Sequence, residues 1–289
     1  MNLNPFRNLK RKSKSEIAVH LFVSAFFMLL ALSYIYILVW AIIAGFKTHN
    51  DIVMSPYSLP KVWLWDHYIE VFETLESNGT NFLGMFFNSV WFSVVPTILT
   101  QLITVTLAYC CEKYKFPGSD LVYPLVLLVT TLPIYGNAGA NYKLHYTLGT
   151  VNSYTFGLVV GGVNANFLFY YAFMKNLSWT YAESAMMDGA NDFQIYYKVM
   201  LPQARAIIGA LFLKNWLGAW NSYAEGLAYY PQLPTLPVGI YQFNKEMIYR
   251  ARLDILFAAC VLITIPALIL FIAFNKTITT NVSIGGIKG

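Results

Sequence analysis

Long apolar runs constrain the fold of this chain more than any other feature. A helix that crosses the ~30 Å hydrocarbon core of a bilayer needs about 20 mostly apolar residues, and several runs approach or exceed that length. Apolar residues make up 57% of the 289 positions and charged residues only 11%. Soluble domains contain about 25% charged residues, so this chain has too few charges to cover a soluble globule. We therefore expect an all-α integral membrane protein.

Six stretches are candidate transmembrane helices. Their approximate bounds are 19–46, 83–110, 121–135, 154–174, 206–228 and 255–274. The third is the weakest, because it is short and contains Pro124 and Pro133. Proline inside a span is tolerated where neighbouring groups satisfy the freed carbonyls. We expect a basic tail over residues 1–18 and a single transmembrane domain over residues 19–289.

The distribution of Lys and Arg predicts the orientation of these spans. With the N-terminus inside, the inner segments carry more Lys and Arg than the outer segments, largely because the tail contains Arg7, Lys10, Arg11, Lys12 and Lys14. Inner loops of membrane proteins carry an excess of positive residues, so both termini are expected in the cytoplasm. The net charge of +5 is then a topology signal and not a nucleic-acid-binding surface.

The residue patterns of enzymes and of proton-coupled transporters are missing. The three cysteines and four histidines show no spacing typical of a metal site or a disulfide framework. A phosphate-binding loop needs a Gly-Lys pair, and the sequence contains none. A secondary transporter should place a titratable carboxylate or histidine at membrane depth, but Asp120, Glu225 and Asp254 lie at the ends of predicted spans.

The inner connection at residues 175–205 carries the most specific pattern. Ala182 to Met187 favours a helix, and Asp188-Gly189 is a turn dipeptide in which glycine can adopt a positive φ. Apolar residues then recur at helical spacing at Phe193, Tyr196, Tyr197 and Met200. The pattern predicts a helix, a sharp turn and an amphipathic helix. Periodicity alone would fit a helical hairpin lying on lipid equally well.

The spacing within this connection resembles the EAA loop of ABC-importer permeases. That loop reads Glu-Ala-Ala, three residues, Gly, nine residues, Ile, one residue, Leu-Pro, and this chain departs from it mildly at Ser184 and Val199. The resemblance implies a contact with an ATPase subunit. The residues expected to make it are Glu183, Ser184, Ala185, Asp188, Gly189, Val199, Leu201 and Pro202.

Further segments resemble the carbohydrate permeases of the maltose type, specifically the second, six-span member of the permease pair. They are 45–48, 88–89, 116–118, 220–221, 235–239 and 285–289. The resemblance implies a type I ABC importer transmembrane domain in a bacterial plasma (inner) membrane. Its partners would be a second permease subunit in a heterodimer, two ATPase subunits, an extracytoplasmic sugar-binding protein and membrane lipid, with no nucleic acid.

The function implied is that of a permease subunit, and not an enzyme, in an ATP-driven importer of oligosaccharides. This chain would bind no cofactor, because ATP and magnesium would bind the ATPase subunits. An ABC permease for amino acids or another solute is the alternative, followed by a secondary transporter. The Thr235–Gly239 segment and the glycine-rich C-terminus favour sugars over the other solutes of ABC permeases.

Two further contact sites follow from the resemblance. The outer segment at 229–254 is expected to contact the binding protein through Tyr229, Tyr230 and Tyr241, and the alternative is a plain solvent loop. The C-terminal residues are expected to contact the ATPase subunits, and the alternative is a frayed terminus. The residues concerned are Gly285, Gly286, Lys288 and Gly289.

The substrate path is expected to use polar and aromatic side chains at membrane depth. The candidates are Asn166, Tyr171, Lys214, Asn221 and Tyr223. Lys214 lies ~13 Å along a helix from Arg205 and departs from the apolar residue usual in maltose-type permeases. It either extends toward the inner headgroups or a carbonyl, or lines the path and attracts an acidic sugar. A Gly157-x-x-x-Gly161 motif indicates close helix packing, across the permease dimer or within this subunit.

Overall fold

The computed structural model describes residues 14–132, 136–159, 164–250 and 252–281. These residues are mostly helical, with no β-strand among them beyond an isolated bridge between Ser77 and Thr80. Most of the basic tail lies outside the described residues, as do the predicted ATPase contacts at Gly285, Gly286, Lys288 and Gly289. The expectation of an all-α chain is confirmed for the part that the structure describes.

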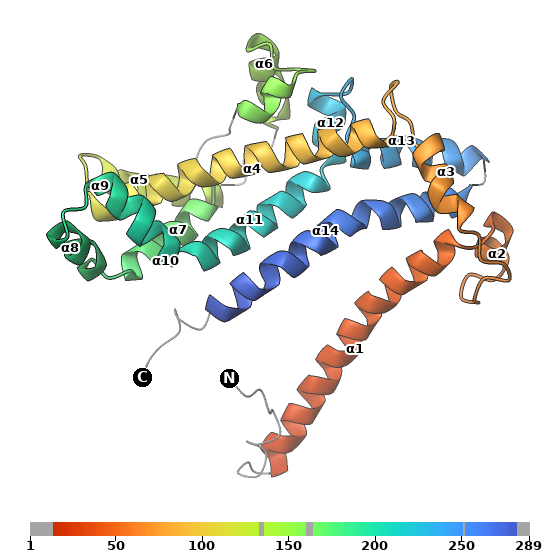
Figure 1. Ribbon diagram of the computed structural model, residues 1–289, viewed down its shortest axis with the longest axis horizontal. Helices are drawn as coiled ribbons and strands as arrows, with labels where there is room; N and C mark the ends of the chain where they lie inside the picture. The colour runs from red at the N-terminus through yellow and green to blue at the C-terminus, as the bar shows by residue number, and fades with distance from the viewer. Residues whose placement is uncertain (1–13, 133–135, 160–163, 251, 282–289) are drawn as a thin grey trace.

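Three helices are long and apolar enough to cross a membrane: α1 (Lys14–Gly45), α4 (Phe82–Lys113) and α14 (Leu253–Asn281). They correspond to the predicted first, second and sixth spans. Figure 1 shows α4 and α14 on either side of α11 (Arg205–Trp220), whereas α1 leaves this layer and meets it only near α2. Side chains of α1 are accordingly exposed until its last turns, where Ala44 and Gly45 become buried.

The other three predicted spans are shorter in the structure. The apolar helix α5 covers only Ser119–Thr131, since Pro133 disfavours a helical conformation for the residue before it. Helix α11 ends at Trp220, and the amide Nδ2 of Asn221 donates to the Leu217 carbonyl at 2.8 Å. A short helix, α12 (Tyr223–Tyr229), follows. The expectation that 206–228 forms one helix is therefore wrong.

The predicted fourth span, 154–174, is also not one helix. A 3-10 turn, η2, covers Tyr154–Leu158, and the α-helix α7 begins only at Asn166 and ends at Asn176. Two features disfavour a continuous helix: two glycines, Gly161 and Gly162, precede α7 in the sequence, and the Asn164 side chain accepts a hydrogen bond from the Asn166 backbone N–H at 2.9 Å. The interruption leaves Asn164 and the backbone beside it outside any helix.

The inner connection folds as a hairpin at one end of α4 (Figure 1). It consists of α8 (Thr180–Met187), α9 (Asp192–Gln194), a π-helical turn η3 (Ile195–Met200) and α10 (Leu201–Gln203). We call residues 175–205 the coupling hairpin. Its inner face is apolar, with Ala182, Ile195 and Met200 fully buried in a cluster with side chains of α4 and α7.

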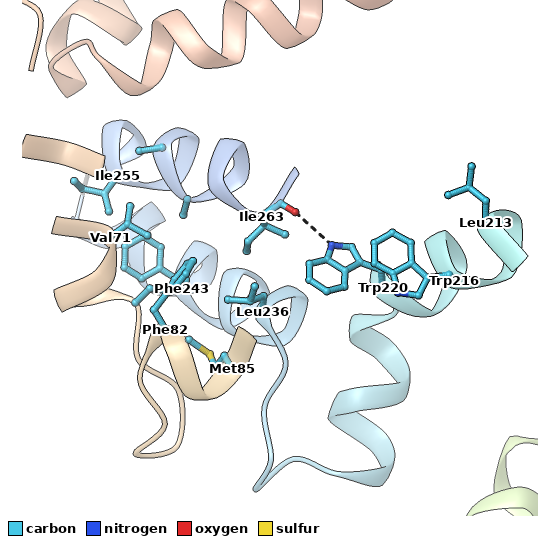
Figure 2. Close-up of a cluster of buried hydrophobic side chains, with 13 residues drawn as sticks. Val71, Phe82, Met85, Leu213, Trp216, Trp220, Leu236, Phe243, Ile255 and Ile263 are labelled. Atoms are coloured by element: carbon cyan, nitrogen blue, oxygen red, sulfur yellow. Dashed lines mark hydrogen bonds between the residues drawn. The ribbon is translucent and has the colours of Figure 1, made fainter. Parts of the chain in front are cut away.

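The opposite end of the molecule holds α2 (His49–Met54), α3 (Asp66–Thr74) and α13 (Leu236–Arg250), with α6 (Ala138–Thr147) between the two ends (Figure 1). A second apolar cluster joins α3 and α13 to the long helices α4 and α14 (Figure 2). Helix α11 contributes Leu213, Trp216 and Trp220 to it, and the Trp220 indole N–H donates to the Ile263 carbonyl at 3.3 Å. Burying these large side chains fixes which face of α11 points away from the core.

Candidate coupling hairpin and polar cavity

The turn of the coupling hairpin is a helix C-cap of the Schellman type. Gly189 has a φ of +80°, its N–H donates to the Met186 carbonyl at 3.0 Å, and the Ala190 N–H donates to the Ala185 carbonyl at 3.0 Å. Asp188 occupies the C-cap position. These two bonds satisfy carbonyls that the end of a helix otherwise leaves open. The predicted sharp turn at Asp188-Gly189 is confirmed.

The segment after the turn is locked by a reciprocal cap. The Asn191 side chain accepts from the Gln194 N–H at 2.9 Å, and the Gln194 side chain accepts from the Asn191 N–H at 3.1 Å. This capping box starts the second helix of the hairpin and brings Phe193 and Tyr197 onto one face, where their rings stack 6.3 Å apart. The predicted helix–turn–helix is therefore present.

The outer face of the coupling hairpin is unusually apolar for an exposed surface. Met187 is 89% exposed and Phe193 is 72% exposed. Of the residues predicted to contact an ATPase, Glu183, Ser184, Asp188, Gly189 and Pro202 are exposed, and Ala185, Val199 and Leu201 are half-buried. Exposed apolar patches rimmed by polar groups mark interaction sites. The arrangement can hold a partner on this face while the opposite face stays packed.

Side-chain hydrogen bonds tie the hairpin to the membrane helices. The Tyr196 hydroxyl and the Thr106 hydroxyl of α4 lie 2.7 Å apart, and the Lys113 ammonium donates to the Leu177 carbonyl at 2.8 Å. Tyr109, also on α4, packs against Tyr196 with ring centroids 4.8 Å apart. A displacement of the hairpin would therefore be transmitted to α4.

A polar cavity of about 820 Å³ lies between α4, α6, α11 and α12. Its uncharged polar lining is Thr97, Thr100, Asn141, Asn164, Asn215 and Ser222. Phe92, Phe156 and Tyr229 add aromatic rings, and Lys214 and Glu225 add one charge of each sign. Ligand sites in proteins combine such aromatic surface with a few polar groups.

Lys214 reaches this cavity because of its place on α11. Leu213 and Trp216 on the neighbouring positions are buried in the core, so Lys214 and Gly218, one turn apart, face the cavity. The Gln101 amide donates to the Ile208 carbonyl at 2.6 Å and fixes the register of α4 against α11. Of the five predicted substrate-path residues, Lys214 is the one that lines this cavity.

The structure places the other four predicted path residues elsewhere. Asn166 is buried at the start of α7, and Tyr171 packs against Tyr123 with ring centroids 5.0 Å apart. Asn221 and Tyr223 line a separate pocket of about 410 Å³ beside α13 and α14. The cavity residues that sequence reasoning missed, Asn141, Asn164 and Asn215 among them, sit in segments whose proximity no local pattern reveals.

The outer segment 229–254 is mostly helix α13 and not an open loop. The Asn88 amide donates to the Pro234 carbonyl at 3.0 Å, and the Ser89 hydroxyl accepts from the Leu236 N–H at 2.8 Å. Tyr230 is only 3% exposed and stacks on Phe92 at 3.9 Å, so its ring is not offered at the surface, contrary to expectation.

The two other predicted tyrosines keep part of their surface. Tyr229 lines the polar cavity and packs beside His145, with ring centroids 5.2 Å apart. Tyr241 stacks on Tyr223 at 4.7 Å, with the Lys245 ammonium 4.5 Å from its ring centroid. Contact of this segment with a binding protein stays a prediction.

The surroundings of Gly157 show whether this glycine of the GxxxG motif packs within the subunit. A Cβ at Gly157 would lie 3.2 Å from the indole nitrogen of Trp91 on α4, and that indole donates to the Tyr154 carbonyl at 2.9 Å. Gly157 therefore serves packing within this subunit. Gly161 lies outside the described residues.

The chain is similar in sequence to known permease proteins. No protein-family model matches the chain. It is 29% identical over 254 residues to the diacetylchitobiose uptake system permease protein NgcG of Streptomyces coelicolor, a match that covers 86% of this chain and 82% of the relative. It is 27% identical over 275 residues to the arabinooligosaccharides transport system permease protein AraQ of Bacillus subtilis, over 92% and 95% of the two chains.

A solved structure shares the fold. A chain of a bacterial ABC transporter involved in the import of the acidic polysaccharide alginate superposes with a TM-score of 0.74. The match covers 92% of this chain and 98% of that one, at 18% sequence identity. The protein is therefore a homologue of the permease subunits of sugar ABC transporters, and it has the fold of an ABC-importer permease.

Proposed function

We propose that this chain is one of two permease subunits in an ATP-driven importer of oligosaccharides that a binding protein delivers. The relatives are named for uptake of diacetylchitobiose and arabinooligosaccharides, which supports saccharides over amino acids or other solutes. A polar cavity of about 820 Å³ with aromatic walls has the size and chemistry of a site for a few sugar rings. This subunit forms half of the translocation path.

The coupling hairpin is the site at which an ATPase subunit docks. The observation that carries this proposal is its exposed outer face, with Met187, Phe193 and the carboxylate of Glu183 on the two helices that the capped turn joins. The hairpin's bonds to α4 supply a rigid link from the docking site to the cavity. ATP hydrolysis belongs to two partner subunits, which bind ATP and magnesium, and the glycine-rich C-terminus adds a second contact with them.

The proposed topology has six spans, with both termini in the cytoplasm of a bacterial cell. The helices α1, α4 and α14 are each long and apolar enough to cross the membrane as one continuous helix. The shorter α5, α7 and α11 complete the six. Asn164 before α7 and Asn221 after α11 each line a cavity, which is where non-helical backbone is tolerated at membrane depth. The α2–α3 end and α13 then face the binding protein, and the coupling hairpin faces the ATPase subunits.

A charge reversal tests the docking site. Glu183→Lys in the purified complex should abolish saccharide-stimulated ATP hydrolysis while the two permeases and two ATPase subunits still co-purify, because it opposes a contact charge without touching the packed face. Asp120→Lys on α5, an exposed carboxylate outside the hairpin, is the matched control and should leave hydrolysis unchanged. Normal stimulated hydrolysis in the Glu183 variant would remove the proposed docking site.

A further inference from the structure

The polar cavity contains a cation that the protein itself does not neutralise. In the part of the chain that the structure describes, the Lys214 ammonium has no hydrogen bond or ion pair, and its side chain is exposed to the cavity. A lysine near the middle of a span costs at least ~2.5 kcal/mol on insertion scales unless a polar cavity or a partner receives it. Its place on the cavity face of α11 meets that condition.

The other charged and titratable groups of the cavity do not serve as its partner. Glu225 lies on α12, and no ion pair joins it to Lys214 among the described residues. Burial lowers the pKa of His145 from its ordinary value, so this imidazole is neutral at pH 7 and adds no second cation. The cavity is therefore polarised, with one cation on α11 and one carboxylate on α12.

The uncharged lining suits a polyhydroxylated ligand. Amides of Asn141, Asn164 and Asn215 can bond sugar hydroxyls, and the half-buried ring of Tyr229 offers a surface on which the apolar face of a sugar can stack. A neutral sugar would leave Lys214 without a counter-charge. An anionic group beside it gains from the low local dielectric, where an opposite charge is attracted far more strongly than in water.

We propose that Lys214 binds the carboxylate of an acidic saccharide, so that the importer takes up uronate-bearing oligosaccharides. The sugar lies in the polar cavity with its anionic group at α11 and with hydroxyls toward Glu225, which repels a second anion placed at that end. This inference rests on the proposed function and names its substrate class. Lys214 acts as a specificity-determining residue.

The test compares an acidic saccharide with its neutral counterpart. The complete importer, with partner permease, ATPase subunits and binding protein, is placed in proteoliposomes. The probes are labelled di- to tetrasaccharides from digested alginate and pectate, and the same mixtures after reduction of each carboxylate to a hydroxymethyl group. The wild-type importer should take up the acidic form faster by about tenfold or more, because only that form can pair with the Lys214 ammonium.

Three variants locate the preference. Lys214→Met should lower uptake of the acidic form about tenfold and spare the reduced form, because only the acid loses its counter-charge. Lys214→Arg should keep the preference. Lys143→Met, which removes an exposed cation of α6 outside the cavity lining, should change neither uptake. Co-purification of the subunits should be the same in all four proteins.

Each result decides the proposal. Equal uptake of acidic and reduced forms by the wild type, or an equal loss of both in Lys214→Met, overturns the role of Lys214. If the wild type shows ATP-dependent uptake of neutral oligosaccharides without a charge preference, this inference fails and the proposed function stands. If it takes up no saccharide in the presence of ATP, both fail.

Discussion

Gly189 shows how one residue sets the form of the coupling hairpin. Its φ of +80° lies in the left-handed region, and a Cβ there would meet no neighbour within 4 Å. Space is therefore not the constraint at this position. The constraint is conformational, because β-branched residues are strongly disfavoured at positive φ.

We expect Gly189→Val to unfold or reorient the turn, because a strain of roughly 1–3 kcal/mol acts on a cap that only two hydrogen bonds close. Coupled ATP hydrolysis should then fall at least about tenfold. Gly149→Val is the control, because Gly149 also has a positive φ, of +66°, with open space around it, but lies outside the hairpin. The measurement is saccharide-stimulated phosphate release by the intact complex. Equal losses in both variants would show that strain anywhere, and not the hairpin turn, limits coupling.

Asn88 is a second residue with a distinct role, because it joins three segments. Its amide donates to the Pro234 carbonyl at 3.0 Å, and its carbonyl accepts from the Tyr154 hydroxyl at 2.7 Å. Asn88→Leu should lower the free energy of unfolding by about 1–3 kcal/mol, the cost of leaving buried polar groups unpaired. Thermal melts of the purified complex measure it, with Tyr154→Phe, which removes one of the two bonds, giving a smaller loss. A larger loss in Tyr154→Phe than in Asn88→Leu would contradict this assignment.

The sequence predicted some of these residues and could not predict others. Lys214 stands out because a charge inside an apolar run is costly and therefore informative. The hairpin could be located because its turn and caps are local in sequence. Asn164 and Asn215 are amides within predicted spans, as Asn166 and Asn221 are, and the packing of the helices, which a single sequence does not specify, decides which of them line the cavity. The expected exposure of Tyr230 is wrong for the same reason, because its ring is buried against Phe92 by a tertiary contact.

At the scale of elements, the contact region between α1, α2, α3 and α14 depends on charged side chains, of which Lys47 and Asp254 are buried. Lys47, 1% exposed, donates to the Ser55 carbonyl at 2.9 Å and the Pro56 carbonyl at 3.2 Å. Arg252 pairs with Glu70 at 2.8 Å and with Asp254 at 3.2 Å. The hydrogen bond to Glu70 raises the pKa of Arg252. The Lys47 bonds hold the segment after α2 against the end of α1, and the Arg252–Glu70 pair holds α3 beside the start of α14.

Lys47→Met tests this contact region. It removes the ammonium's hydrogen bonds to Ser55, Pro56 and Ser58 while keeping the aliphatic stem, so we expect the free energy of unfolding to fall by about 1–3 kcal/mol. Lys61→Met is the control, because Lys61 is largely exposed and makes only a surface ion pair with Asp51 at 3.2 Å, which is worth at most ~1 kcal/mol. The measurement is the thermal midpoint of the purified complex. A fall in the Lys61 variant as large as in the Lys47 variant would contradict the account.

Sequence patterns located the long elements well and the broken ones poorly. The runs that became α1, α4 and α14 are continuous and apolar, so length alone identified them. The run at 154–174 is equally apolar, but its glycines and Asn164 divide it into η2 and α7. The outer segment at 229–254 forms helix α13 although it contains prolines, because Pro237 sits in the first turn of that helix, where proline is tolerated.

At the scale of the whole molecule, the coupling hairpin and the α2–α3 end lie at opposite ends (Figure 1). If the six-span topology holds, these ends face opposite sides of the membrane. Cysteines introduced at Met187 and at Glu73, both exposed, report on the two ends once Cys110, Cys111 and Cys260 are replaced by alanine. In intact cells a membrane-impermeant maleimide should label Glu73→Cys and should label Met187→Cys only after permeabilisation. The reverse pattern, or labelling of both from one side, would contradict the topology.

The central claim is that this subunit moves saccharide at the expense of ATP hydrolysed by its partners. The most direct measurement is accumulation of a labelled oligosaccharide in proteoliposomes that contain the complete importer, with ATP or ADP supplied on the side of the coupling hairpin. We predict accumulation with ATP, none with ADP, and none when this chain is left out. Accumulation driven by an imposed proton gradient without ATP, or ATP-dependent accumulation that persists without this chain, would contradict the account.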